Sequence, residues 1–226
     1  MESSTNRQVN QSLPATVITH KSFLLPRLFQ LAFVLLSAVP LLQPALALDE
    51  LATIDPLAPM DGPGERNIGW QWHYVDSDGK PGYMEKVAGD ETTASYERTD
   101  GCKWTRPVKG FAPASTWSDC PSTGKADVSF SEGVIWPLTV GAKFIWSIRG
   151  TSNLFSRAWK SKRTCEVLPS LRIRTVTGEH DVHKLTCKER WGTRTWWLSP
   201  EVGTAIAYRQ TTKRGVILQE MTHIIP

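Results

Sequence analysis

The chain has 226 residues, of which 26 are Lys or Arg, 22 are Asp or Glu and 4 are Cys, and its formal net charge at pH 7 is +4. If the first 47 residues are an export signal that is removed, roughly 180 residues remain. This is a typical size for one domain with its own hydrophobic core. This mildly basic chain contains no nucleic-acid recognition motif, so we expect no nucleic-acid partner.

The first 47 residues have the pattern of a secretory signal peptide. Basic residues end at Arg27, an apolar run spans residues 28–42, and Ala-Leu-Ala at 45–47 fits a small-x-small cleavage site. The alternative is a membrane anchor, but this apolar run has 15 residues, whereas about 20 are needed to cross a bilayer. We therefore predict a mature chain that starts near Leu48, is periplasmic or secreted, and has no transmembrane segment.

The next segment, residues 48–66, has no regular alternation of apolar and polar residues. Its last eight positions contain four prolines or glycines, which favour irregular backbone. We predict a short linker here, followed by one β-domain over residues 67–226.

From residue 67 onward, apolar residues recur at every second position. Examples are Trp70, Trp72 and Tyr74, and the final run over residues 216–225 has a similar pattern. This period is typical of half-buried antiparallel strands, because successive side chains on a strand point to opposite faces. Turn sequences separate the runs at 76–82, 131–133, 149–153, 176–180, 199–203 and 212–215. The pattern predicts an all-β protein, which could be a sandwich, a barrel or a meander.

All four cysteines lie in the part of the chain that we expect to be exported. An even number of cysteines in an oxidising compartment predicts two disulfides, and of the three pairings we favour the neighbour pairing. The bridges would then join Cys102 to Cys120 and Cys165 to Cys187. The alternative, a zinc site with four cysteine ligands, would need closely spaced pairs such as C-x2-C, and the chain has none.

The second of these bridges depends on the hairpin at residues 176–180. A turn near Gly178 would place Cys187 opposite about residue 168, three positions from Cys165. We expect a bulge at Pro169 to bring the two sulfurs together.

Ten tryptophans lie between residues 70 and 197. Most are expected to pack in the core, and a subset could line an apolar or glycan-binding cleft. Trp196 and Trp197 are neighbours on a predicted strand and should point to opposite faces. Our candidate ligand surface consists of Trp146, Arg174, Arg194 and Trp196.

Motifs for catalysis or metal binding are weak. The histidines of H-D-V-H, His180 and His183, are three apart on a predicted strand and should not chelate one ion, so we expect a solvated turn there. The chain has no G-x-S-x-G nucleophile motif. We expect no catalytic residues, no metal and no cofactor.

Three segments in order resemble exported β-rich proteins of proteobacteria that consist of domains of unknown function. They are GVIWPLTVGAKFIW (133–146), VTGEHDVHKLTC (176–187) and TWWLSPEVG (195–203), with Cys165 between the first two. The resemblance covers roughly residues 100–210. It implies a single, strongly curved antiparallel sheet, half-barrel or barrel-like, and no activity. The chain departs from the family at the hairpin, where His180 stands in place of the Phe of a P-A-G-T-F-like sequence.

Charge is uneven along the chain. Residues 48–100 hold 4 Lys or Arg against 12 Asp or Glu, whereas residues 149–226 hold 14 against 6. The basic half could face an anionic partner, but we favour acidic and basic strands that face each other in one sheet.

These observations leave three functions open. The first is a non-enzymatic binding or interaction module of the cell envelope, acting as a monomer on an envelope protein or on an apolar or anionic ligand. The second is a carrier of a lipid or other apolar ligand in a Trp-lined cavity, and the third is a hydrolase. A filled core with an exposed basic face would favour the interaction module. An aromatic lumen with basic residues at its mouth would favour the carrier.

Overall fold

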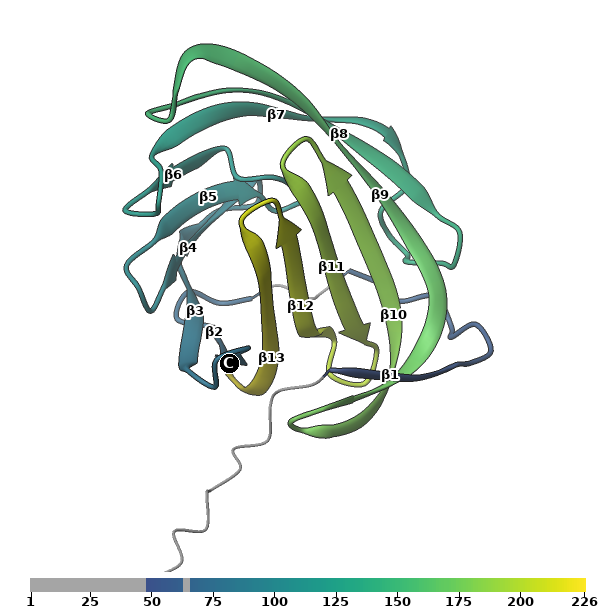
Figure 1. Ribbon diagram of the computed structural model, residues 1–226. Coiled ribbons are helices and arrows are strands. Elements are labelled where there is room, and N and C mark those ends of the chain that lie inside the picture. The colour runs from purple at the N-terminus through teal and green to yellow at the C-terminus, as the bar shows by residue number, and fades with distance from the viewer. Residues whose placement is uncertain (1–47, 63–65) are drawn as a thin grey trace, which may run out of the picture. The chain divides into compact units, whose positions relative to one another are not determined.

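A computed structural model describes residues 48–62 and 66–226, and within these ranges it contains thirteen strands and no helix (Figure 1). The strands are β1 (Asp49–Thr53), β2 (Gln71–Asp76), β3 (Pro81–Gly89), β4 (Thr93–Arg98), β5 (Lys103–Pro107), β6 (Thr116–Ser118), β7 (Gly124–Gly133), β8 (Lys143–Ser152), β9 (Phe155–Thr175), β10 (Gly178–Glu189), β11 (Gly192–Ser199), β12 (Thr204–Thr212) and β13 (Gly215–Ile225). No helix able to cross a membrane is found in these ranges. The predicted signal peptide, residues 1–47, lies outside them.

The strands form one antiparallel sheet that closes into a barrel. Strands β2 to β8 follow one another as neighbours, β9 to β13 do the same, and the two series meet at β13–β2 and at β8–β9 (Figure 1). Twelve of the strands in the described part of the chain therefore make up the barrel. The all-β class and the curved, barrel-like sheet are confirmed, and closure goes beyond a half-barrel.

Strand β9 is long, with 21 residues, and it changes partner along one edge. Residues 155–166 pair with β8, whereas residues 171–174 pair with β1. The segment that we predicted to be a linker thus contributes a strand to the sheet. The same segment contacts the barrel a second time at Met60, which forms an isolated β-bridge with Leu138. Backbone pairing, rather than an apolar pattern, holds β1 in place, because its five residues are all exposed.

Both disulfides have the predicted neighbour pairing, Cys102 with Cys120 and Cys165 with Cys187. Cys165 and Cys187 are directly opposed on β9 and β10, with Cα atoms 4.0 Å apart. In the chain-entropy model, bridges that close loops of this length stabilise the fold by roughly 3 kcal/mol each.

The predicted register of this hairpin was wrong in one respect. The turn lies at residues 176–177, because Gly178 already pairs with Thr175 on β9. The register then shifts between Val182 and Lys184, whose partners on β9 are three residues apart. Pro169 lies within that bulge, so the expected irregularity is present but contributes only part of the shift.

The end of the β9–β10 hairpin is anchored to β13 through a buried carboxylate. Glu220 is 1% exposed, and its Oε2 accepts a hydrogen bond of 2.9 Å from the backbone N–H of Val176 at the hairpin turn. Burial raises the pKa of Glu220 above the ordinary 4.5, since it outweighs that hydrogen bond and is reinforced by the nearby charge of Asp49. The folded protein therefore holds this proton more tightly than the unfolded chain does.

This raised pKa predicts a pH-dependent loss of stability. The contribution of Glu220 is fully present below the unfolded pKa and is lost as the pH rises through the folded pKa. We expect Glu220→Gln, which keeps an acceptor for Val176, to remove this loss, so the variant gains on the wild type over the pH range above the ordinary value of 4.5. Urea unfolding across this range measures the difference, with the exposed Glu201→Gln as the control. A difference that stays constant with pH would contradict the argument.

Candidate functional site

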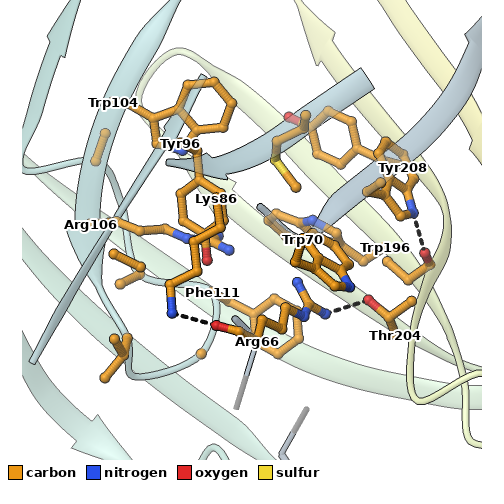
Figure 2. A pocket seen from close by; sticks show the side chains of 18 of the residues that line it. Arg66, Trp70, Lys86, Tyr96, Trp104, Arg106, Phe111, Trp196, Thr204 and Tyr208 are labelled. Carbon is orange, nitrogen blue, oxygen red and sulfur yellow. Dashed lines mark hydrogen bonds between the residues drawn. The ribbon is translucent and has the colours of Figure 1, made fainter. Parts of the chain in front are cut away.

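The barrel encloses a cavity of about 1040 Å3 (Figure 2). Its wall is rich in aromatic side chains: Trp70, Trp72, Tyr74, Tyr96, Trp104, Phe111, Trp136, Trp196 and Tyr208. Strand alternation places them there. Trp72 and Tyr74 occupy alternate positions of β2, and Tyr96 on β4 is paired with Trp104 on β5. Small-molecule pockets commonly have volumes of about 300–1,000 Å3, so this cavity has room for a large ligand.

The cavity is open to solvent, and the loop between β5 and β6 forms part of its wall. Exposed residues of its lining include Ile68, before β2, and Asp90 and Glu91 in the β3–β4 turn. The loop between β5 and β6 places Phe111 in the lining, where its ring centroid lies 5.4 Å from that of Trp196. This loop therefore supplies part of the apolar wall.

Phe111 has a φ of 60°, a left-handed conformation that is uncommon for a bulky residue. The guanidinium of Arg163 on β9 donates a hydrogen bond of 3.0 Å from Nη1 to the carbonyl oxygen of Phe111. The Phe111 ring also packs against Trp136, with ring centroids 5.5 Å apart. The surrounding contacts thus hold the loop in a conformation that its sequence does not favour.

Arg163 belongs to a buried charge cluster in the wall. Its Nη2 lies 3.1 Å from Oε2 of Glu189, and Nε of Arg194 lies 2.8 Å from Oε1 of the same carboxylate. Burial alone would raise the pKa of Glu189, but the two arginines outweigh it and lower the pKa. Burial also lowers the pKa of Arg163, to about 10. The carboxylate of Glu189 is thus the counterion of both arginines.

A second group of cations surrounds Tyr96 (Figure 2). The guanidinium of Arg106 lies over the Tyr96 ring at 4.8 Å, and that of Arg66 lies over Trp70 at 3.9 Å. Lys86 donates from Nζ to the carbonyl oxygen of Arg66. Burial alone would raise the pKa of Tyr96, but these three cations outweigh it and lower the pKa. Burial also lowers the pKa of Arg66, to about 10.

The lining has an excess of positive charge. It contains six Lys or Arg side chains, against Asp90 and Glu91 as carboxylates. Arg98 is paired with Asp100, and the cluster around Glu189 accounts for two more arginines. Within residues 48–62 and 66–226, no carboxylate lies within ion-pair distance of the remaining three, which are Arg66, Lys86 and Arg106.

The structure brings together two of the four predicted ligand residues. Arg194 and Trp196 both line the cavity from β11. Trp146 is 2% exposed and packs edge-on against Phe130 inside the core, outside this lining. Arg174 is also outside it, on β9, in an exposed ion pair with Glu179. A role in ligand binding stays a prediction for all four.

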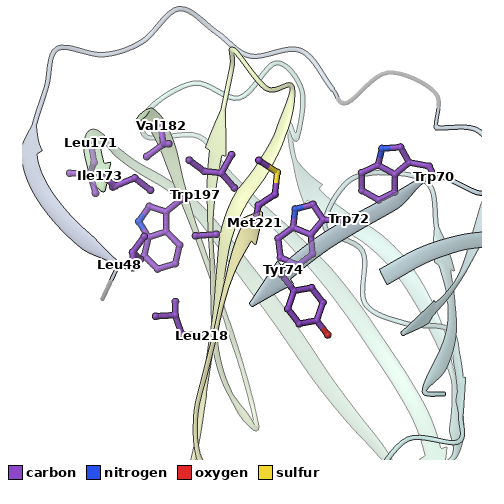
Figure 3. Packing of buried hydrophobic residues seen from close by; sticks show 12 residues of the cluster. Leu48, Trp70, Trp72, Tyr74, Leu171, Ile173, Val182, Trp197, Leu218 and Met221 are labelled. Atoms are coloured by element: carbon purple, nitrogen blue, oxygen red, sulfur yellow. The ribbon is translucent and has the colours of Figure 1, made fainter. Parts of the chain in front are cut away.

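Trp197 lies on the face of β11 opposite to Trp196, as expected for neighbours on a strand. It is fully buried and belongs to a cluster with Leu48, Ile173 and Val182 (Figure 3). Its Nε1 donates a hydrogen bond of 3.1 Å to Oε1 of Glu50 on β1. This outer face of the barrel is therefore covered by the N-terminal segment and by the β9–β10 hairpin.

Sequence reasoning missed the cations around Tyr96. A usable signal was present on β4 and β5, where Tyr96 and Arg98, and Trp104 and Arg106, are two residues apart. An arginine that continues the aromatic face of a strand points to the same side as the aromatic ring, which indicates a lumen with charged groups. Arg66 gave no comparable signal, because it precedes the first predicted strand.

The histidines of the H-D-V-H sequence are placed differently from our prediction of a solvated turn. His183 is fully buried on β10, and its Nε2 lies 3.1 Å from the carbonyl oxygen of Ala58. His180 is partly buried, with Nε2 3.0 Å from Oγ1 of Thr177. Among the described residues, no group of three or more His, Cys, Asp or Glu side chains could hold a metal ion.

No protein-family model matches the sequence, and no curated protein matches it. The resemblance to exported proteobacterial β-proteins therefore stays a prediction. One solved structure to which the chain is similar is the hypothetical lipoprotein YmcC from Escherichia coli (K12), with 9% sequence identity and a TM-score of 0.45. The similarity covers 70% of this chain and 85% of that chain. A similarity of this degree says nothing of a ligand or an activity.

Proposed function

We propose that this protein is a carrier that binds an apolar or amphipathic small molecule inside the barrel. The observation behind the proposal is the cavity of about 1040 Å3, with nine aromatic side chains in its lining and a route to solvent. Apolar, aromatic cavities with a few polar groups are the usual form of small-molecule sites. An aromatic lumen with basic residues was also the feature that distinguished the carrier from a module with a filled core.

The proposed place of action is the cell envelope or the medium. Both disulfides would persist in an oxidising compartment and would be rare in a reducing one. The predicted signal peptide is consistent with export. A carrier in such a compartment would shield its apolar ligand from water, since transfer of apolar surface out of water is favourable.

Native mass spectrometry of the mature protein, purified without reducing agent, tests this proposal first. We expect two disulfides and an additional mass that disappears when the protein is denatured. Titration with N-phenyl-1-naphthylamine, a neutral apolar dye, should then show saturable binding to one site per chain. A clean ligand-free mass together with no saturable dye binding would reject the carrier.

Matched tryptophan variants locate the dye. Trp196→Ala removes a ring from the cavity wall and should weaken dye binding, by about tenfold if the ring contributes roughly 1–1.5 kcal/mol. Trp191→Ala removes a ring outside the described lining, against Trp159 at 4.6 Å, and should leave dye affinity unchanged. Equal effects of both variants would place the dye outside the cavity.

The interaction module is the second candidate, and the β8–β9 hairpin supports it. Leu154 and Phe155 at its tip are 52% and 47% exposed, and Arg157 follows closely on β9. Exposed apolar residues of this size beside positive charge can form part of a contact surface. A protein that fails both carrier tests would leave this hairpin as the surface to examine for partners.

A further inference from the structure

We infer that the ligand carries an anionic group, a carboxylate or a phosphate, and that Arg66, Lys86 and Arg106 bind it beside Tyr96. This inference rests on the proposed carrier function and names the chemical class of its ligand. The apolar body of the ligand would then lie along the aromatic wall that continues from this end of the cavity.

The three cations come from different segments and meet through strand pairing. Lys86 on β3 is paired with Tyr96 on β4, and Tyr96 is paired with Trp104 on β5. Arg106, two residues after Trp104, lies on the same face, opposite the small side chain of Ala94. Opposed side chains on neighbouring strands have Cβ atoms about 5 Å apart, so positions 86, 96 and 104 form one row across the inner wall.

Charge balance also favours an anionic ligand at this group of cations. Cations that share a poorly hydrated site repel one another and are costly to bury without a countercharge. Burial and the charge of Arg106 lower the pKa of Arg66 to about 10. The clustered cations lower the pKa of Tyr96 although its burial opposes this. Within residues 48–62 and 66–226 no carboxylate neutralises this group. An anion brought by the ligand would supply the countercharge.

Free donors give the site its preference for oxygen anions. Arg66 uses Nη2 to donate to Oγ1 of Thr204, and Lys86 uses one donor for the carbonyl oxygen of Arg66. A guanidinium has five N–H donors and an ammonium has three, so both keep donors for a ligand. Arg106 lies over Tyr96 and shares a side-chain hydrogen bond with it, and the remaining donors of its guanidinium suit contact with a carboxylate or a phosphate.

The apolar wall begins next to this group. The rings of Tyr96 and Trp104 are stacked, with centroids 5.7 Å apart, and Trp70 lies under the Arg66 guanidinium. A molecule with its anionic group at the cations would have its adjoining carbon atoms against these rings. The arrangement therefore fits an amphiphile better than a free inorganic ion.

Displacement of N-phenyl-1-naphthylamine from the full mature protein tests the inference with four competitors: dodecanoate, dodecyl phosphate, dodecanol and inorganic phosphate. Below their critical micelle concentrations, at least one of the two anionic amphiphiles should bind about tenfold or more tightly than dodecanol, the gain expected of hydrogen bonds to a charged group. Whichever of the two binds more tightly identifies the head group. Inorganic phosphate should not displace the dye.

Matched charge variants assign the preference to the proposed residues. Lys86→Gln and Arg106→Gln should each reduce the ratio of anionic to neutral affinity by about threefold to tenfold. Lys160→Gln and Arg149→Gln remove exposed cations outside the lining and should leave the ratio unchanged. Raising the salt concentration should weaken the anionic amphiphile more than dodecanol.

The outcomes separate the two proposals. If dodecanol binds as tightly as both anions, the anionic class is wrong and the carrier function stands. If the anions are preferred but Lys86→Gln and Arg106→Gln do not reduce the preference, the head group lies elsewhere and the assignment is wrong. If the dye does not bind and the native mass is also ligand-free, both proposals fail.

Discussion

Trp197→Ala is expected to destabilise the protein by about 3–5 kcal/mol, the usual cost of emptying a large buried aromatic site. The ring is fully buried among residues of β9, β10 and β12, and its loss also removes one of the two partners of the Glu50 carboxylate, the other being Lys184. Since natural domains are stable by about 5–15 kcal/mol, this variant should lose a large share of its stability. Thermal and urea unfolding followed by circular dichroism measure the effect.

Trp196→Ala is the matched control one residue earlier. Its ring faces the hollow cavity and meets Phe111 and Tyr208 at centroid distances of 5.4 and 5.5 Å. The remaining space already lacks packing atoms, so we expect a loss of only about 1 kcal/mol together with the weakened dye binding described above. If the two variants are equally destabilising, Trp196 is a structural residue and is not free to serve a ligand.

Strand content could be predicted from the sequence because each half-buried strand carries its own pattern. Phe144, Trp146 and Ile148 alternate along the chain, and all three are buried on one face of β8. The disulfide pairing followed from the same local reasoning, since Cys165 and Cys187 lie on the two arms of one hairpin. These features depend on short stretches of chain.

Closure of the barrel could not be predicted in this way. It requires β13 to pair with β2, two strands far apart in the sequence, and this pairing uses backbone groups that have no sequence signature. The β-bulge at Ile206 is a second feature that alternation along one strand does not predict. A plain alternation would place Ile206 on the face of Tyr208, but the register shifts at this position, and Ile206 lies outside the cavity lining whereas Tyr208 is part of it.

The candidate site was only partly predictable for the same reason. Arg194 and Trp196 could be found because they alternate on one strand. The group around Tyr96 joins β3, β4, β5 and a residue before β2, so its existence depends on tertiary pairing. That the lumen is hollow depends on the packing of every inward side chain, which no single motif encodes.

Glu189→Gln tests how much the charge cluster in the cavity wall contributes to the fold. We expect a loss of about 3–5 kcal/mol, because the change leaves Arg163, itself 4% exposed, buried without its countercharge. The pKa of Glu189 is lowered, so its contribution is present above the unfolded value near 4.5 and is lost as the pH falls through the folded pKa. Urea unfolding at neutral pH should therefore show a larger difference from the wild type than unfolding in acid.

Glu166→Gln, on β9, provides the control for this change. Glu166 pairs with Lys143 at 3.3 Å with both side chains exposed, and an exposed pair contributes little, here less than about 0.5 kcal/mol. If Glu189→Gln lowers the free energy of unfolding no more than this control does, water in the cavity solvates the two arginines. A large decrease would show that the charge cluster in the cavity wall stabilises the fold. Arg163 donates a hydrogen bond to the carbonyl oxygen of Phe111, so the charge cluster that stabilises the wall also keeps Phe111 in the cavity lining. Glu189→Gln should therefore lower ligand affinity as well as stability.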